Sequence, residues 1–283
     1  MEKAQHPVGF LQGRLTPQDE RGFQYFPNRV GEWESEFERA KQIGAECIEL
    51  LIERRADLYD LVHPLASDTN ADHLKSVIAS TGVPVLSIHT FFEHDATYAE
   101  ELKTIVIRAA AVGARMIMVP FFDEYSITGG RIRSDIAALL APAIGEAAAR
   151  GMKIGIEAEV SAQDIVEFTG HCSVPLTVGI NYDIGNAFAC GFPVLEEIRA
   201  YGKHIVGVHV KDRTRLPDGL AGKTTPLGSG SADLKGAINE MIVAGYAGPF
   251  IVQGARQEGR DDNTVVAEYI SLVRTLIDGV TNK

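Results

Sequence analysis

Short apolar runs alternate with amphipathic segments along the whole chain, and most of the apolar runs follow a glycine. The runs are nearly continuous and rich in Val and Ile, which is typical of parallel strands buried on both faces. Eight runs have this character, at about residues 7–11, 46–53, 83–89, 115–120, 153–159, 176–182, 204–210 and 248–253. The clearest segments with helical periodicity lie between or after them, at 33–43, 71–80, 99–112, 132–150, 234–244 and 265–277.

Repeated strand and helix units with no Pro-, Gly- or Ser-rich linker predict one α/β domain over residues 1–283, a single (β/α)8 TIM barrel. A doubly wound open sheet is the alternative, but no glycine-rich phosphate-binding motif follows the first apolar run. Six glycines stand where a helix would end and a strand would follow. We expect each to form a left-handed helix C-cap, since glycine has no Cβ to clash there: Gly44, Gly82, Gly113, Gly151, Gly202 and Gly245.

Composition narrows the classes of partner. The 283 residues include 27 Lys and Arg and 38 Asp and Glu, a formal net charge of −11, which argues against a nucleic-acid partner. No apolar run is long enough for a membrane span, and the N-terminal residues contain no long apolar region of the signal-peptide kind. Three cysteines without paired spacing favour a reduced, cytoplasmic protein.

Polar residues enter the later apolar runs near their ends. Glu157, Asp183, His209 and Gln253 come from four successive predicted strands. Because alternate side chains of a strand share a face, all four can point to the barrel axis at its catalytic end. Three oxygens and one imidazole nitrogen suit Mn²⁺ or Mg²⁺, with Zn²⁺ as a further candidate. The alternative is a buried polar network that holds no metal.

Several segments together resemble the xylose isomerase-like barrel superfamily. The similarity is greatest to sugar phosphate isomerases and epimerases of the hexulose-6-phosphate isomerase and L-ribulose-5-phosphate 3-epimerase type. It covers nearly the whole chain and is strongest between about residues 151 and 255. The segments are GFLQGRLTP (9–17), NYDIGN (181–186), KHIVGVHVKDR (203–213), PLGSGSADLKGAI (226–238) and AGYAGPFIVQ (244–253).

The resemblance implies an enzyme, a sugar or sugar phosphate isomerase or epimerase that works through an enediolate. In such proteins Glu, Asp, His and a second Glu bind one divalent metal, and the two glutamates exchange protons with the substrate. The first three positions carry over to Glu157, Asp183 and His209, and the fourth falls on Gln253. The resemblance also implies a small sugar substrate and a homo-oligomer, because relatives often form dimers or tetramers.

Glutamine at the fourth position changes the expected chemistry. The amide of Gln253 can still offer an oxygen to a metal, but it cannot take a proton. Epimerisation by proton exchange on two substrate faces would therefore lack its second base. Glu157 alone could serve an aldose–ketose isomerisation or the elimination catalysed by a lyase or dehydratase on a keto-sugar or cyclitol. A catalytically impaired sugar-binding relative is the third possibility.

Other polar residues are candidates for a replacement acid or base and for substrate contacts. Glu49, Glu53, His89 and Glu159 are the candidates for proton transfer, and Glu49 lies inside an apolar run, where a carboxylate is costly unless it is paired. The turn at 228–230 could cradle an anion at a helix start, or could be a plain capped loop. The residues predicted to bind substrate are Arg14, His89, Glu159, Asn186, Lys211 and Arg215.

Overall fold

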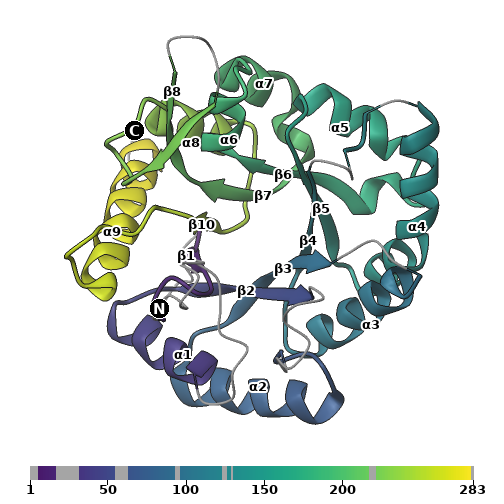
Figure 1. The fold of residues 1–283 in the computed structure, drawn as a ribbon, viewed down its shortest axis with the longest axis horizontal. Helices are drawn as coiled ribbons and strands as arrows, with labels where there is room; N and C mark the ends of the chain where they lie inside the picture. The colour runs from purple at the N-terminus through teal and green to yellow at the C-terminus, as the bar shows by residue number, and fades with distance from the viewer. Residues whose placement is uncertain are drawn as a thin grey trace.

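A closed barrel of parallel strands forms the centre of the computed structural model, which describes residues 6–16, 32–54, 63–92, 96–122, 126–128, 130–216 and 221–281. Within these ranges the strands follow the order β1, β10, β7, β6, β5, β4, β3, β2 around the barrel (Figure 1). The predicted barrel is confirmed, and β1 closes it by pairing with both β2 and β10. The strands are β1 (Val8–Leu11), β2 (Cys47–Arg54), β3 (Val85–Phe92), β4 (Met116–Phe121), β5 (Lys153–Ala158), β6 (Val178–Asp183), β7 (Ile205–Val210) and β10 (Phe250–Val252).

Helices surround the strands as an outer ring (Figure 1). Every helix predicted from periodicity is present, and the sequence did not single out the three short helices α5, α6 and α7, which have 8, 6 and 8 residues. The helices are α1 (Glu32–Gln42), α2 (Asp68–Thr81), α3 (Tyr98–Ala111), α4 (Gly130–Ala149), α5 (Ala162–Thr169), α6 (Ile184–Ala189), α7 (Val194–Tyr201), α8 (Leu234–Val243) and α9 (Asp262–Thr281).

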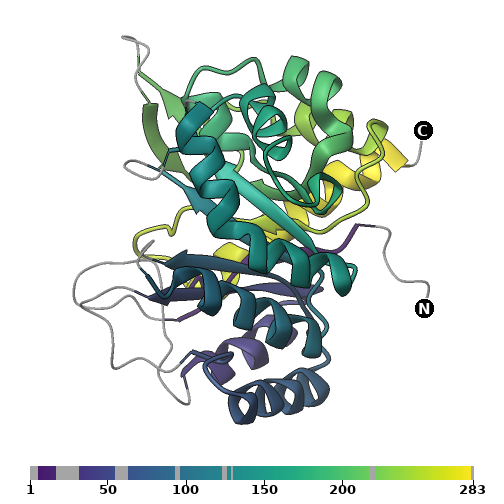
Figure 2. The same ribbon diagram turned by 90° about the vertical axis from the view of Figure 1, so that its right-hand side faces the viewer.

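An antiparallel hairpin lies between the seventh barrel strand and α8. Its strands are β8 (Asp212–Arg215) and β9 (Ala221–Thr225), in a stretch where the sequence showed no regular pattern. In the side view the green hairpin stands on the left, opposite the yellow end of α9 on the right (Figure 2). Because β8 follows β7 after one residue, the hairpin rises from the C-terminal mouth of the barrel.

Strand alternation separates two apolar regions of the core. On β2, Ile48, Leu50 and Ile52 belong to the large cluster between the strands and the helices. Cys47 and Leu51 alternate with them and belong to a smaller cluster with side chains of β1 and β10. Glu49 stands between these two residues and therefore faces the barrel interior, where it is 0% exposed.

The predicted glycine caps hold at all positions but one. Five of the six glycines have positive φ, whereas Gly202 has a right-handed helical φ of −55°. Close packing explains glycine there, because a Cβ would lie 2.5 Å from the Cβ of Ala244.

All three cysteines of the chain are free thiols. Cys47 and Cys172 are buried, and Cys190 is partly buried. Burial raises the pKa of the Cys172 thiol to about 11, so this thiol is protonated at neutral pH. None of the described helices is both apolar enough and long enough to span a bilayer.

Gly9→Ala is expected to destabilise the barrel at the β1–β2 contact. A Cβ at Gly9 would lie 2.3 Å from the carbonyl oxygen of Cys47. That oxygen belongs to the backbone of β2, which cannot move away without disturbing its pairing with β1. We expect the free energy of unfolding in a urea titration to fall by about 2 kcal/mol or more. The control is Gly145→Ala on α4, where nothing lies within 4 Å of the new Cβ. That variant should gain about 0.5–1 kcal/mol, and equal stability of the two variants would contradict the packing argument.

Candidate active site

Four of the predicted site residues lie at the C-terminal mouth of the barrel on adjacent strands. Glu157 is next to last in β5, Asp183 is last in β6, His209 is next to last in β7, and Gln253 directly follows β10. All four are at most 5% exposed. Parallel strands of a barrel end at the same mouth, which is why residues distant in sequence meet here.

The side chains of three of these residues form one compact group. The ligand atoms of Glu157, Asp183 and His209 all lie within 4.8 Å of one another, as in a metal site. His209 Nδ1 lies 2.9 Å from Glu157 Oε2 and 2.9 Å from Gln253 Nε2. Turning the Gln253 amide by 180° would exchange its nitrogen for its oxygen, so the same position can present an oxygen ligand.

A register shift between β6 and β7 sets this geometry. Ile180 pairs with Ile205, but Asn181 pairs with Gly207, so β7 carries one extra residue at this point. The shift places Asp183 directly opposite His209. Such irregularities re-aim side chains beside active sites.

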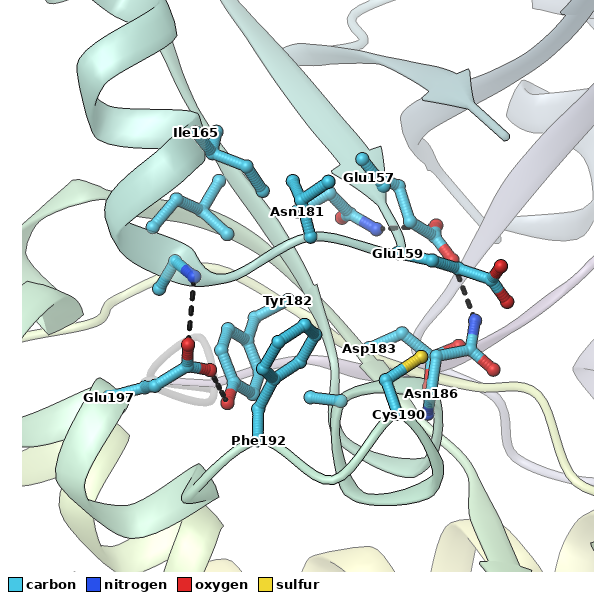
Figure 3. Close-up of a pocket in the computed structure, with 15 residues that line it drawn as sticks. Glu157, Glu159, Ile165, Asn181, Tyr182, Asp183, Asn186, Cys190, Phe192 and Glu197 are labelled. Carbon is cyan, nitrogen blue, oxygen red and sulfur yellow. Dashed lines mark hydrogen bonds between the residues drawn. The ribbon is translucent and has the colours of Figure 1, made fainter. Parts of the chain in front are cut away.

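Two asparagines fix the carboxylate of Glu157. Asn181 Nδ2 donates to Oε2 at 3.0 Å and Asn186 Nδ2 donates to Oε1 at 3.3 Å (Figure 3). The backbone N–H of Asn186 also donates to Asp183 Oδ1 at 2.8 Å, since Asp183 is the N-cap of α6. Asn186 thus touches both carboxylates. Asn181 was not among the predicted site residues, although its position two residues before Asp183 on the same strand face was the available signal.

The other nitrogen of His209 faces a second group. Glu49 Oε1 lies 2.7 Å from His209 Nε2, and the hydroxyl of Ser87 donates to Glu49 Oε2 at 2.6 Å. His89 Nδ1 lies 3.7 Å from Glu49 Oε1, and the rings of His89 and His209 stack with centroids 5.7 Å apart. The ligand atoms of Glu49, His89 and His209 also lie within 4.8 Å of one another. Sequence reasoning offered no reason to select Ser87.

The contacts of His209 with two carboxylates shift the pKa values of all three groups. Burial disfavours its charged form, yet the carboxylates of Glu157 and Glu49 outweigh burial and raise the pKa of His209 well above 6.5. Burial alone would raise the carboxyl pKa values, but the charge and hydrogen bonds of His209 bring the pKa of Glu157 down to about 2 and lower that of Glu49. These shifts favour a charged imidazole between two ionised carboxylates.

Three side chains of the cluster have buried polar atoms without a hydrogen bond. Among the described residues, Asp183 Oδ2, Asn181 Oδ1 and both ring nitrogens of His89 have no such partner. Burial raises the pKa of Asp183, against the influence of Lys211, whose Nζ lies 3.7 Å from Oδ2. Burial also holds the pKa of His89 at about 4, so its ring is neutral at neutral pH. An unsatisfied buried carboxylate oxygen beside two further ligand groups fits a divalent cation.

The predicted substrate-binding residues lie at different distances from this cluster. His89 and Asn186 are part of it, and Lys211 is one contact away. Glu159 is exposed because β5 ends at Ala158, and it lines a hollow that also contains Glu157 and Asn186 (Figure 3).

The two predicted arginines have neighbours in other parts of the chain. Arg215 is exposed, and its guanidinium lies so close to Gly191 that a Cβ there would be 2.2 Å from Nη2. Arg14 is 4% exposed and lies near Glu36, whose carboxylate accepts the backbone N–H groups of the neighbouring residues 13 and 15. The side chain of Glu53, a candidate for proton transfer, lies outside the described residues.

The backbone N–H groups at the turn 228–230 bind a carboxylate of the chain itself, that of Asp212. Asp212 Oδ2 accepts the backbone N–H groups of Gly228 at 3.0 Å and Gly230 at 2.8 Å, and Oδ1 accepts that of Ala232 at 3.2 Å. Asp212 is 1% exposed. These three amides are therefore already satisfied, and the turn does not offer them to a substrate phosphate.

The fold and the site together define a class of protein: a parallel α/β barrel that gathers acidic, imidazole and amide groups at its C-terminal mouth. A family model described as "Xylose isomerase-like TIM barrel" matches residues 37–276, and the chain belongs to this family. The match confirms the resemblance found in the sequence motifs.

Individual relatives agree with this assignment. The L-ribulose-5-phosphate 3-epimerase UlaE of Escherichia coli (strain K12) is 26% identical over 264 residues, which cover 83% of this chain and 87% of the relative. A xylose isomerase domain protein from Planctomyces limnophilus superposes with a TM-score of 0.75 at 18% identity, covering 98% of this chain and 99% of that chain. A xylose isomerase-like TIM barrel protein from Mycobacterium smegmatis in complex with magnesium gives 0.72 at 17% identity, covering 97% and 98%.

The pKa values of the two stacked histidines should be shifted in opposite directions when no divalent cation is added. His209 should stay protonated above pH 6.5, because two carboxylates favour its charged form. His89 should stay neutral until the pH falls towards 4, because burial disfavours its charged form. Nitrogen-15 NMR of histidine-labelled protein in EDTA, between about pH 5 and pH 8, measures both states. Assignment uses the single variants His89→Asn and His209→Asn, and joint titration near 6.5 would refute this account of the cluster.

Proposed function

We propose that the chain is a divalent-cation-dependent isomerase or epimerase of a ketose, keto-sugar or sugar phosphate. One observation carries the proposal: Glu157, Asp183 and His209 gather their ligand atoms within 4.8 Å at the mouth of the barrel. The buried Asp183 Oδ2, which accepts no hydrogen bond from the described residues, adds a carboxylate oxygen to the same group. Gln253 would complete the set with its amide oxygen.

The donor set indicates the kind of cation. Two carboxylates, an amide oxygen and one imidazole nitrogen are mainly hard ligands, which suit Mn²⁺ or Mg²⁺, and Zn²⁺ also accepts such ligands. A bound divalent cation would polarise a substrate carbonyl and stabilise the negative charge that develops when a neighbouring carbon loses its proton.

Glu157 is the proposed base. Its carboxylate would take the proton from the hydroxyl-bearing carbon next to the substrate carbonyl and return it to the former carbonyl carbon. The hydroxyl proton would pass to the former carbonyl oxygen, so that the carbonyl and hydroxyl groups exchange positions. Asn181 and Asn186 hold both of its oxygens in place.

Substrate hydroxyl or phosphate groups would contact the polar side chains around the mouth. Lys211 is 19% exposed, and its ammonium group lies next to Asp183, so it is the cation best placed for a substrate oxygen. Asn186 and Glu159 line the hollow beside Glu157. His89, Arg14 and Arg215 remain candidates for such contacts. The named activity of the Escherichia coli relative, on L-ribulose 5-phosphate, supports a sugar phosphate as one substrate class.

Gln253 supports a second candidate function, that of a lyase or dehydratase. This side chain lies where the family pattern places a second glutamate, 2.9 Å from His209, and an amide cannot accept the proton that epimerisation on two faces requires. The position favours one-base chemistry. Besides aldose–ketose isomerisation, a lyase or dehydratase that acts on a keto-sugar or cyclitol needs only Glu157 as base.

Isotope exchange tests the proposed function directly. A panel of ketoses and ketose phosphates, incubated with the protein and Mn²⁺ in deuterated water, should acquire carbon-bound deuterium that NMR or mass spectrometry detects. Glu157→Gln should lower the exchange rate by about 100-fold or more, because the base is lost. Glu100→Gln on α3, whose side chain is 74% exposed, is the charge-matched control and should exchange like the wild type. No exchange with any substrate of either kind would count against an isomerase or epimerase.

Gln253→Glu tests the consequence of the glutamine. The variant restores a second carboxylate beside His209, so we expect it to form epimers that the wild-type protein does not form. Chiral chromatography of the products from the same panel measures the outcome. Epimer formation by the wild type would show that another group supplies the second proton, and turnover by the variant alone would identify a catalytically impaired relative.

A further inference from the structure

His209 has a carboxylate on each of its two ring nitrogens. Nε2 lies 2.7 Å from Glu49 Oε1, and Nδ1 lies 2.9 Å from Glu157 Oε2. A neutral imidazole has one N–H group and one lone pair, so it can bind a cation on one side only. The partner of the other nitrogen then decides which lone pair is available.

The side chains around Nε2 of His209, on the side of Glu49, are buried. Glu49 and Ser87 are 0% exposed, and His89 is 3% exposed. Glu49 Oε2 already accepts the Ser87 hydroxyl at 2.6 Å, so the ligands that the described residues offer on this side are Glu49 Oε1, a ring nitrogen of His89 and His209 Nε2. The stacked rings of His89 and His209 also close this side. Neither Glu49 nor His89 lines the hollow that contains Glu157 and Asp183.

The side of Glu157 is open towards the mouth. Glu157 and Gln253 both contact Nδ1, Asp183 has a carboxylate oxygen within 4.8 Å of a ligand nitrogen of His209, and Asp183 Oδ2 has no hydrogen-bond partner among the described residues. Glu157 and Asp183 also line the hollow drawn in Figure 3. The cation therefore belongs on the Nδ1 side.

We propose that Glu49 is a positioning residue: it accepts the Nε2–H of His209 and so presents the Nδ1 lone pair to the cation, and this inference rests on the proposed function. The pairing forms a carboxylate–histidine–cation arrangement of the kind that orients metal ligands.

The backbone supports this role. Between β2 and β3 the register shifts after Ile48, which pairs with Val85, so that Glu49 pairs with Ser87. The shift adds one residue to β3 and sets the Ser87 hydroxyl opposite the Glu49 carboxylate. Ser87, Glu49 and His209 thus form one hydrogen-bonded chain from β3 through β2 to β7. An apolar side chain in place of Glu49 would suit its neighbours Cys47 and Leu51, but it would leave Nε2 without an acceptor.

The first test measures cation affinity rather than activity. Calorimetric titration with Mn²⁺ should show that Glu49→Gln weakens binding by about 10-fold to 100-fold and that Glu49→Ala weakens it further, since the glutamine can still accept one hydrogen bond. Glu36→Gln is the matched control. Glu36 is also 0% exposed, but its carboxylate accepts backbone N–H groups of residues 13 and 15 rather than an imidazole, so its loss should leave Mn²⁺ affinity within about twofold.

The second test needs no variant of Glu49. Nitrogen-15 NMR of the histidine-labelled wild-type protein loaded with Zn²⁺ should show His209 with its proton on Nε2 and the cation on Nδ1. A proton on Nδ1, with the cation on Nε2, would overturn the inference. So would unchanged Mn²⁺ affinity in a folded Glu49→Gln variant. If the wild-type protein itself binds neither cation at millimolar concentration, the proposed function fails and this inference fails with it.

Discussion

The contact on which this site depends is the imidazole of His209 between two buried carboxylates. Each partner would be costly to bury alone, and the charged ring compensates both Glu49 and Glu157 in the cation-free protein. The same ring offers the nitrogen that a divalent cation would need. One side chain therefore stabilises the interior of the barrel mouth and, in the proposed function, also takes part in the chemistry.

Small departures from regular strand pairing make this arrangement possible. One extra residue in β3 sets Ser87 opposite Glu49, and one extra residue in β7 sets Asp183 opposite His209. Side chains alternate between the faces of a strand, so a shift of one residue decides whether a polar group faces the site or the helices. The barrel thus uses two local irregularities to aim groups on both sides of a single imidazole.

Gln253 and the turn at 228–230 both affect which reactions and which substrates the site can serve. Gln253 keeps its place beside His209 but lacks an ionisable proton, so proton transfer would fall to Glu157. Asp212 occupies the backbone amides of residues 228, 230 and 232, so these groups serve to fix the loop that follows the hairpin. Recognition of any substrate phosphate must then come from other groups at the mouth, among which Lys211 lies next to Asp183.

The barrel could be predicted from the amino-acid sequence, because the spacing of buried strands, helices and capping glycines is local information. The sequence also selected Glu157, Asp183, His209 and Gln253, since polar residues near the ends of apolar strands are conspicuous. The contacts of these four side chains could be read only from the three-dimensional structure. The pairing of Glu49 with His209 joins residues 160 positions apart, and it depends on strand register, which hydrophobic patterning does not specify to one residue. Likewise, the sequence could not reveal that Asp212 fills the turn at 228–230, because a carboxylate and an incoming anion satisfy the same amides.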